Sequence, residues 1–118
     1  MSAETALRAL LIAAVPVTAL VGQRIASDRI EQGAVRPFVV FSRTESAPLL
    51  GIDGTVYKTL VSIDIQCWSD TRLDAEAVAD AVTAAIRATT PQLVSGRSGG
   101  YDADLDLEVA SLSIEWWE

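Results

Sequence analysis

The chain has 118 residues, half of them hydrophobic, and this suits one domain with a single core. Sixteen acidic and nine basic residues give a net charge of −7, which excludes broad adhesion to nucleic acid or anionic lipid, because both need clusters of Lys and Arg. A single cysteine excludes an internal disulfide, and the lack of histidine removes the commonest general base and transition-metal ligand. We therefore expect one domain over residues 1–118, no catalytic residues, no metal and no cofactor.

The N-terminal part of the chain is predicted to be a helix over residues 3–14. Its apolar stripe at helical spacing consists of Leu7, Leu10, Leu11 and Ala14. Pro16 lacks the amide that a continuing helix needs, so the helix should stop before it. Residues 9–21 are almost wholly apolar, but thirteen residues are too few for a helix that spans a bilayer, which needs about 20. A core helix explains this run better than a signal peptide does, and we expect no membrane contact.

Three strands are predicted to follow this helix. Residues 23–30 alternate weakly, as in an edge strand, and residues 38–43 are aromatic and β-branched, as in a strand covered on both faces. Residues 55–68 alternate in the period of two that marks a strand with one buried face. The predicted buried row consists of Tyr57, Thr59, Val61, Ile63, Ile65 and Cys67. Cys67 lies within this row, so we interpret it as a small core residue and not as a nucleophile.

Apolar side chains at unexpected places predict a contact with another protein. Residues 44–54 contain Pro48, Gly51 and an Asp-Gly pair, which are turn formers, so we expect a long hairpin loop there. Large apolar residues lie in this loop, on the polar face of the third strand and at the C-terminus, and such residues need a partner if they are not core. The candidate interface consists of Leu49, Leu50, Ile52, Val56, Leu60, Trp68 and Trp117.

The second half of the chain is predicted to be a helix followed by a strand. Thr71 and Asp74 resemble a capping box before a helix over residues 73–88, whose apolar face is Val78, Val82, Ala85 and Ile86. The glycine-rich residues 95–100 are expected to be a flexible connection. Residues 101–117 are predicted to be the last strand. Its apolar row changes parity near residues 110–111, which favours a β-bulge over a bend into a second sheet.

Four acidic residues recur at every second position at the start of this last strand. They are Asp102, Asp104, Asp106 and Glu108. A calcium loop beginning at Asp102 would need Gly at its sixth position and Glu at its twelfth, where Leu107 and Ser113 stand. A spacing of two instead places all four carboxylates on one side of a strand. We therefore predict a solvated acidic face without a metal.

The predicted fold class is α+β. The elements follow the order helix, strand, strand, strand, helix, strand, which predicts a largely antiparallel sheet of about four strands. We expect the two helices to pack on one face of this sheet and to cover the buried row of residues 57–67. A long hairpin loop should leave the sheet between its second and third strands.

This order of elements and several short motifs resemble the tail-completion proteins of long-tailed bacteriophages, also called tail terminators or head–tail joining proteins. The similar segments are QGAVRPFVVFSR at residues 32–43, TVYKTLVSIDIQCWSD at residues 55–70 and the ending IEWWE. The positions that match the family pattern are Gln32, Gly33, Ala34, Pro37, Phe38, Val39, Val40, Trp68 and Ser69. The resemblance covers nearly the whole chain, and its motifs are structural and not catalytic.

The resemblance implies a structural role in virion assembly. Proteins of this family form a ring, usually a hexamer, on the last ring of the tail tube, where they end its polymerisation and join the tail to the head connector. The implied partners are further copies of the chain, the tail tube protein and a connector or neck protein, at the head-proximal end of a tail assembled in the host cytoplasm. DNA would pass through the ring without specific binding. From charge alone, we further expect the acidic face of Asp102, Asp104, Asp106 and Glu108 to line the lumen of the ring. The alternatives are a head-closure, neck or minor tail ring protein and, from another class, a small-ligand-binding module or an enzyme.

Overall fold

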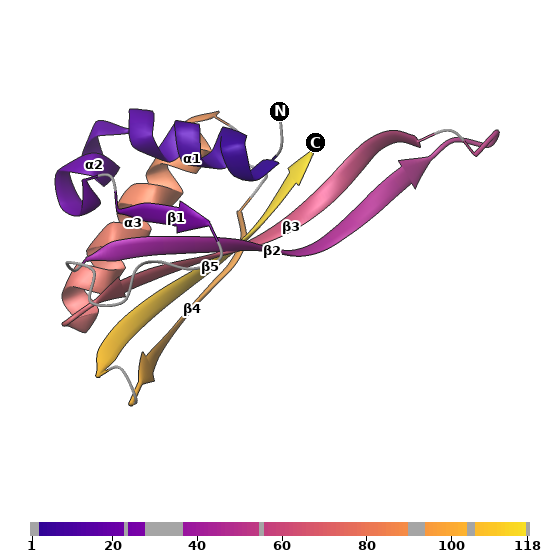
Figure 1. The fold of residues 1–118 in the computed structure, drawn as a ribbon. Coiled ribbons are helices and arrows are strands. Elements are labelled where there is room, and N and C mark those ends of the chain that lie inside the picture. Colours follow the sequence, from indigo (N-terminus) through magenta and orange to yellow (C-terminus); the bar gives the residue numbers. More distant parts are fainter. Residues whose placement is uncertain are drawn as a thin grey trace.

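The computed structural model describes residues 3–22, 24–27, 37–54, 56–89, 94–103 and 106–117. Within these residues three helices cover one face of a single sheet, and two of the strands continue far beyond it (Figure 1). The elements are α1 (Ala3–Ala13), α2 (Val15–Val21), β1 (Ile25–Ser27), β2 (Phe38–Leu50), β3 (Val56–Ser69), α3 (Arg72–Thr89), β4 (Val94–Asp102) and β5 (Leu107–Trp117). The predicted α+β class and the packing of helices on one face are confirmed.

The sheet has the strand order β1-β2-β3-β5-β4 among the described residues. β1 runs parallel to β2, and every other neighbouring pair is antiparallel, so the prediction of a largely antiparallel sheet is confirmed. The expected count of about four strands is too low, because β4 forms from a segment that was expected to be a connection. The expected count of two helices is also too low, because the chain makes a separate short helix after Pro16.

Pro16 ends one helix and begins the next. α1 stops at Ala13, and α2 then begins at Val15 with the proline in its first turn, where the missing N–H has no intrahelical partner to lose. α2 in turn ends at Gly22, which has a φ of 61° and donates its N–H to the carbonyl of Thr18 at 2.8 Å. Two helices in succession can therefore follow the curved face of the sheet. No helix in the described ranges has the length and apolarity needed to cross a membrane.

The core lies between the helices and the inner face of the sheet. The prediction for the third strand is confirmed from Val61 to Cys67, where alternate side chains are buried. The helices close over this row with Leu7 and Leu11 of α1, Val17 and Val21 of α2, and Val78, Val82 and Ile86 of α3. Thr59 is half-buried, and the side chain of Tyr57 lies outside the described part of the chain.

The predicted cap of α3 is present. The backbone N–H of Asp74 donates to the hydroxyl of Thr71 at 3.2 Å, which satisfies one of the N–H groups that a helix start leaves without a partner.

Thr71→Ala should lower the free energy of unfolding by about 1 kcal/mol, because this bond is lost while the surrounding contacts remain. Urea denaturation measures the loss. Thr71→Ser keeps a hydroxyl and is the matched control; an equal loss in both variants would contradict the capping role.

The predicted loop at residues 44–54 is wrong, because β2 continues through it to Leu50. A register shift after Arg43 lets the strand pass beyond the core, and its pairing with β3 then continues to the Leu50–Val56 pair. Pro48 is tolerated inside this strand because, among the described residues, β1 pairs with β2 only between Val39 and Phe41 and no other strand lies along the outer edge of β2 at the proline. We call the projecting part, residues 48–59, the arm.

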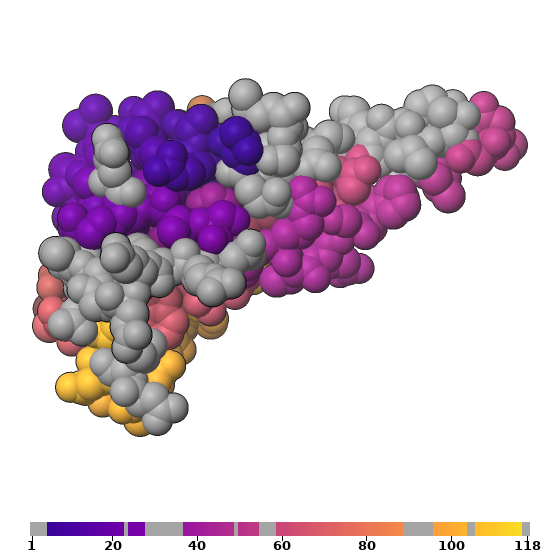
Figure 2. Space-filling model, in the orientation of Figure 1, coloured from indigo at the N-terminus to yellow at the C-terminus, as the bar shows by residue number. Residues whose placement is uncertain are grey.

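The arm makes the molecule elongated. The principal extents of the whole molecule are 51, 30 and 23 Å. Its radius of gyration is 14.9 Å, whereas a compact chain of this length would have about 13.5 Å. Figure 2 shows the arm standing clear of the body of the molecule. Among the described residues, β5 pairs with β3 only as far as Leu60, so the two strands of the arm are bonded only to each other. A two-stranded ribbon is marginally stable by itself, which predicts a binding partner for the arm.

The C-terminal hairpin differs from the prediction in two ways. Residues 95–100 were expected to be a flexible connection, but they belong to β4 and pair with β5. A Cβ atom at Gly99 would lie 2.5 Å from a guanidinium nitrogen of Arg72 on α3, so the end of this flexible side chain would have to move if a larger residue stood there. The β-bulge predicted near residues 110–111 is also wrong, because β5 keeps an unbroken register with β3 from Glu108 to Trp117.

The apparent change of parity in β5 has a simple cause. Leu107 and Val109 face away from the helices, whereas Ala110, Leu112 and Ile114 face the core. A β-bulge moves the apolar residues of a strand from odd to even positions in the sequence. A strand with apolar side chains first on one face and then on the other gives the same sequence pattern without a bulge. The described residues show the second cluster, in which Val109 pairs with Trp68.

Candidate functional site

The tip of the arm exposes two large aliphatic side chains. Leu50 at the end of β2 is 57% exposed, and Ile52 in the turn is fully exposed. A backbone hydrogen bond of 3.0 Å from the N–H of Gly54 to the carbonyl of Gly51 closes the turn, and Gly54 takes a φ of 83° that suits a residue without a side chain. The tip is therefore a preformed apolar projection, and its two predicted interface residues are close in sequence and in space.

The remaining predicted interface residues are spread along the sheet. Leu60 is half-buried and lies on the outer face, the face turned away from the helices, where its ladder partners are Ala47 and Trp117. Trp68 is half-buried on the same face and stacks on Phe38, with ring centroids 6.5 Å apart. The side chains of Leu49, Val56 and Trp117 lie outside the described part. Trp68 thus has a partner within its own chain, which the sequence pattern did not indicate.

The predicted acidic face does not lie on one strand. Asp102 ends β4, Asp106 lies in the turn with a φ of 54°, and Glu108 belongs to β5, while Asp104 is outside the described residues. The carboxylates follow a hairpin turn at the end of the sheet far from the arm (Figure 1). The hydroxyl of Tyr101 donates to Asp106 at 2.5 Å, and this bond raises the pKa of the tyrosine. No group of three or more potential metal ligands comes together within the described ranges.

Cys67 lies in the centre of the core, as predicted. Its side chain is fully buried, and burial raises the pKa of its thiol to about 12, with Arg97 opposing and Glu76 adding to the shift. A thiol with this pKa is almost wholly protonated at neutral pH, and the thiolate is the reactive form. The residue therefore contributes packing and not nucleophilic chemistry.

The buried thiol predicts a loss of stability at high pH. Below pH 9.0 the thiol is protonated in both states; between 9.0 and about 12 the unfolded chain releases the proton while the folded chain retains it. The free energy of unfolding should therefore fall in this window, by up to about 1.4 kcal/mol for each pH unit. Urea denaturation at pH 8, 9 and 10 tests this. Cys67→Ala should decline less steeply than the unmodified chain, and equal slopes would contradict the argument.

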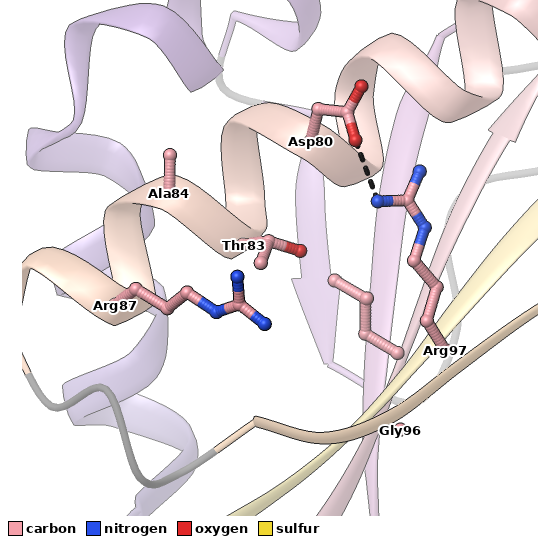
Figure 3. Close-up of a pocket in the computed structure, with 7 residues that line it drawn as sticks. Asp80, Thr83, Ala84, Arg87, Gly96 and Arg97 are labelled. Atoms are coloured by element: carbon pink, nitrogen blue, oxygen red, sulfur yellow. Dashed lines mark hydrogen bonds and ion pairs between the residues drawn. The ribbon is translucent and has the colours of Figure 1, made fainter.

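A pocket of about 540 Å³ lies between α3 and β4 (Figure 3). Its polar lining consists of Asp80, Thr83, Arg87 and Arg97. Arg97 donates to Asp80 at 2.7 Å and also bonds to Glu76, and the bond to Asp80 is the main cause of its raised pKa. The Thr83 hydroxyl is buried and has no hydrogen-bond partner among the described residues, and the side chain of Arg87 extends beside it.

This pocket offers binding groups but no nucleophile with an activating base. Asp80 is held by Arg97, so it is not placed to take a proton from Thr83. The contacts of Arg97 instead join β4 to α3, since both of its acidic partners are on that helix. Because Arg97 and its partners are partly exposed, this network adds only modestly to stability.

The chain matches the model of a known protein family and resembles a solved structure in its fold. The model of a family described as "Tail completion protein gp17" matches residues 5–118, which confirms the resemblance found in the sequence. A solved chain from the "Virion of native gene transfer agent (GTA) particle" superposes with a TM-score of 0.70 at 17% identity, over 97% of this chain and 92% of that one. At this identity the superposition establishes a shared fold. A search of the curated proteins finds no match.

Proposed function

The chain belongs to the tail completion protein gp17 family, and from this membership we propose that it is a structural protein of a virion tail. It forms a ring, a hexamer by family resemblance, on the last ring of the tail tube, ends the polymerisation of the tube and joins the tail to the head connector. The observation that carries this proposal is the family match over residues 5–118. The likeness in fold to a chain of a gene transfer agent virion supports it.

The proposed partners follow from this position. They are further copies of the chain, the tail tube protein and a connector or neck protein, and the protein acts without catalysis at the head-proximal end of a tail assembled in the host cytoplasm. The arm supports an assembly role, because it projects from the core and exposes Leu50 and Ile52 at its tip. The other candidate interface residues are Leu49, Val56, Leu60, Trp68 and Trp117.

Electron microscopy of a lysate that lacks this protein tests the role. Overlong tails are expected, because nothing would stop the growth of the tube. Tailless heads beside tails of normal length would overturn the capping role and favour a head-closure or neck protein. Light scattering of the purified chain, alone and with tube protein, is the second test. A strict monomer in both samples would overturn the ring.

A second part of the proposal concerns the acidic turn. Asp102, Asp104, Asp106 and Glu108 would face a channel through which DNA passes without specific binding, since like charges repel and the chain carries a net charge of −7. A structure of the assembled ring that places these carboxylates on its outer rim would overturn this assignment. The tail-length experiment does not depend on it.

A further inference from the structure

The helical layer contains an apolar groove that no pattern in the sequence indicates. It has a volume of about 430 Å³, and every residue that lines it is apolar. One wall is formed by Leu10, Ala13 and Pro16 from the region where α1 passes into α2, and the other by Ala81, Ala84 and Ala88 of α3. The small alanine side chains leave the space open. Val15, beside the groove in sequence, is 74% exposed.

The tip of the arm and this groove complement each other. The tip presents Leu50 and Ile52, two branched aliphatic side chains exposed to water, and the groove offers an apolar surface of matching character. A cavity of about 150 Å³ can enclose one benzene-sized group, so 430 Å³ has room for both side chains. Bringing the two surfaces together would remove both from water, which is favourable in proportion to the apolar area that is covered.

The arm cannot fill the groove of its own chain. It continues the ladder of β2 and β3 outward, whereas α1, α2 and α3 cover the body of the sheet from which the arm projects away (Figure 1). The hydrogen-bonded ladder runs from the sheet to the Leu50–Val56 pair, so folding the arm back would disrupt the pairs where the arm joins the sheet. A tip that fills this groove therefore comes from another molecule.

We propose that the arm tip of one chain seats in the groove between α1, α2 and α3 of a second copy. This contact rests on the proposed ring and names its adhesive parts. Each copy carries one tip and one groove on different surfaces, so the contact is heterologous, and such a contact produces a closed ring when the rotation between copies closes. The preformed turn at residues 51–54 lowers the ordering cost of binding.

Cross-linking between two cysteine variants tests the contact. One chain carries Ile52→Cys at the tip and the other Ala88→Cys in the groove, and Cys67 can remain because it is buried. A short bismaleimide should join the two variants when they are mixed in a ring-forming sample, while neither variant alone should give a cross-linked dimer. The matched control replaces Ala88→Cys with Ala77→Cys, at an exposed alanine of α3 that does not line the groove. Equal cross-linking at both alanines would overturn the contact.

A blocking substitution gives an independent readout. Ala88→Arg should fill the groove and reduce assembly at least tenfold, while arginine in the last turn suits the helix dipole and leaves the fold intact. Ala77→Arg is its control and should assemble normally.

The two experiments separate the arm contact from the ring. If the chain assembles in light scattering but residues 52 and 88 do not cross-link, the arm contact is wrong and the proposed ring stands. If no assembly occurs with or without tube protein, both the proposed ring and the proposed arm contact are wrong. Cross-linking of Ile52→Cys to tube protein alone would assign the tip to that partner and overturn the contact between copies.

Discussion

A chain whose arm is replaced by a tight turn should fold normally and remain a single molecule in solution. In the suitable variant Asn-Gly replaces residues 48–59 and connects Ala47 to Leu60, which are ladder partners, because a two-residue turn of this kind joins paired antiparallel positions. All residues of the hydrophobic core lie outside the deleted segment. The free energy of unfolding should therefore change by only about 1 kcal/mol, since shortening a connection has a small effect on loop entropy.

The loss of assembly, by contrast, should be complete, because the variant lacks both exposed side chains of the tip. Light scattering measures the mass of each assembly, and urea denaturation confirms that the shortened chain is folded. Leu73→Ala is a useful control, because it removes a large exposed apolar side chain from α3 without touching the arm. Rings of the same mass with and without the arm would show that the arm is not needed for the contact between copies.

The second large effect is expected in the core. Ile65 is fully buried at the centre of β3, where it pairs with Phe41 on one side and Leu112 on the other. Ile65→Ala should lower the free energy of unfolding by about 2–5 kcal/mol, because apolar contact is lost and a cavity remains among neighbours that three strands and a helix hold in place. Ile65→Val removes one methylene group and should cost about 0.5–1.5 kcal/mol.

Thermal unfolding gives a second measure of the same change. At about 4 °C for each kcal/mol, Ile65→Ala should lower the Tm by roughly 8–20 °C. Leu73→Ala again serves as the control, since Leu73 is 83% exposed and such surface substitutions change stability by about 0.5 kcal/mol or less. Similar losses at the two positions would contradict the placement of residue 65 in the core.

The periodic segments were predictable because their pattern depends on local geometry. Val61, Ile63, Ile65 and Cys67 alternate with the period of a strand, and Val78, Val82 and Ile86 recur with the period of a helix. The cap at Thr71 was predictable for the same reason, since its partner is three residues away. In each case the residues that interact are near one another in the chain, so short-range spacing indicates the contact.

The errors arose where a residue's neighbours are distant in sequence. Pro48 and Gly51 indicated a loop, but a strand can continue through the proline because no strand in the described part of the chain pairs with the edge of β2 beyond Phe41. Residues 95–100 were expected to be a connection, but their pairing with β5, a segment that follows later in the chain, places these glycines in a strand. Turn propensity is a local preference, and pairing across a sheet overrides it.

The sequence by itself determined the α+β class, the buried row of the central strand and the family, because these depend on periodicity and on short motifs. It also identified Leu50 and Ile52 as apolar residues without a place in the core. Only the tertiary structure decided that they form the tip of a projecting arm and that α1, α2 and α3 leave an apolar groove. The groove consists mainly of alanines from segments about 70 residues apart, so it exists only after the helices have packed.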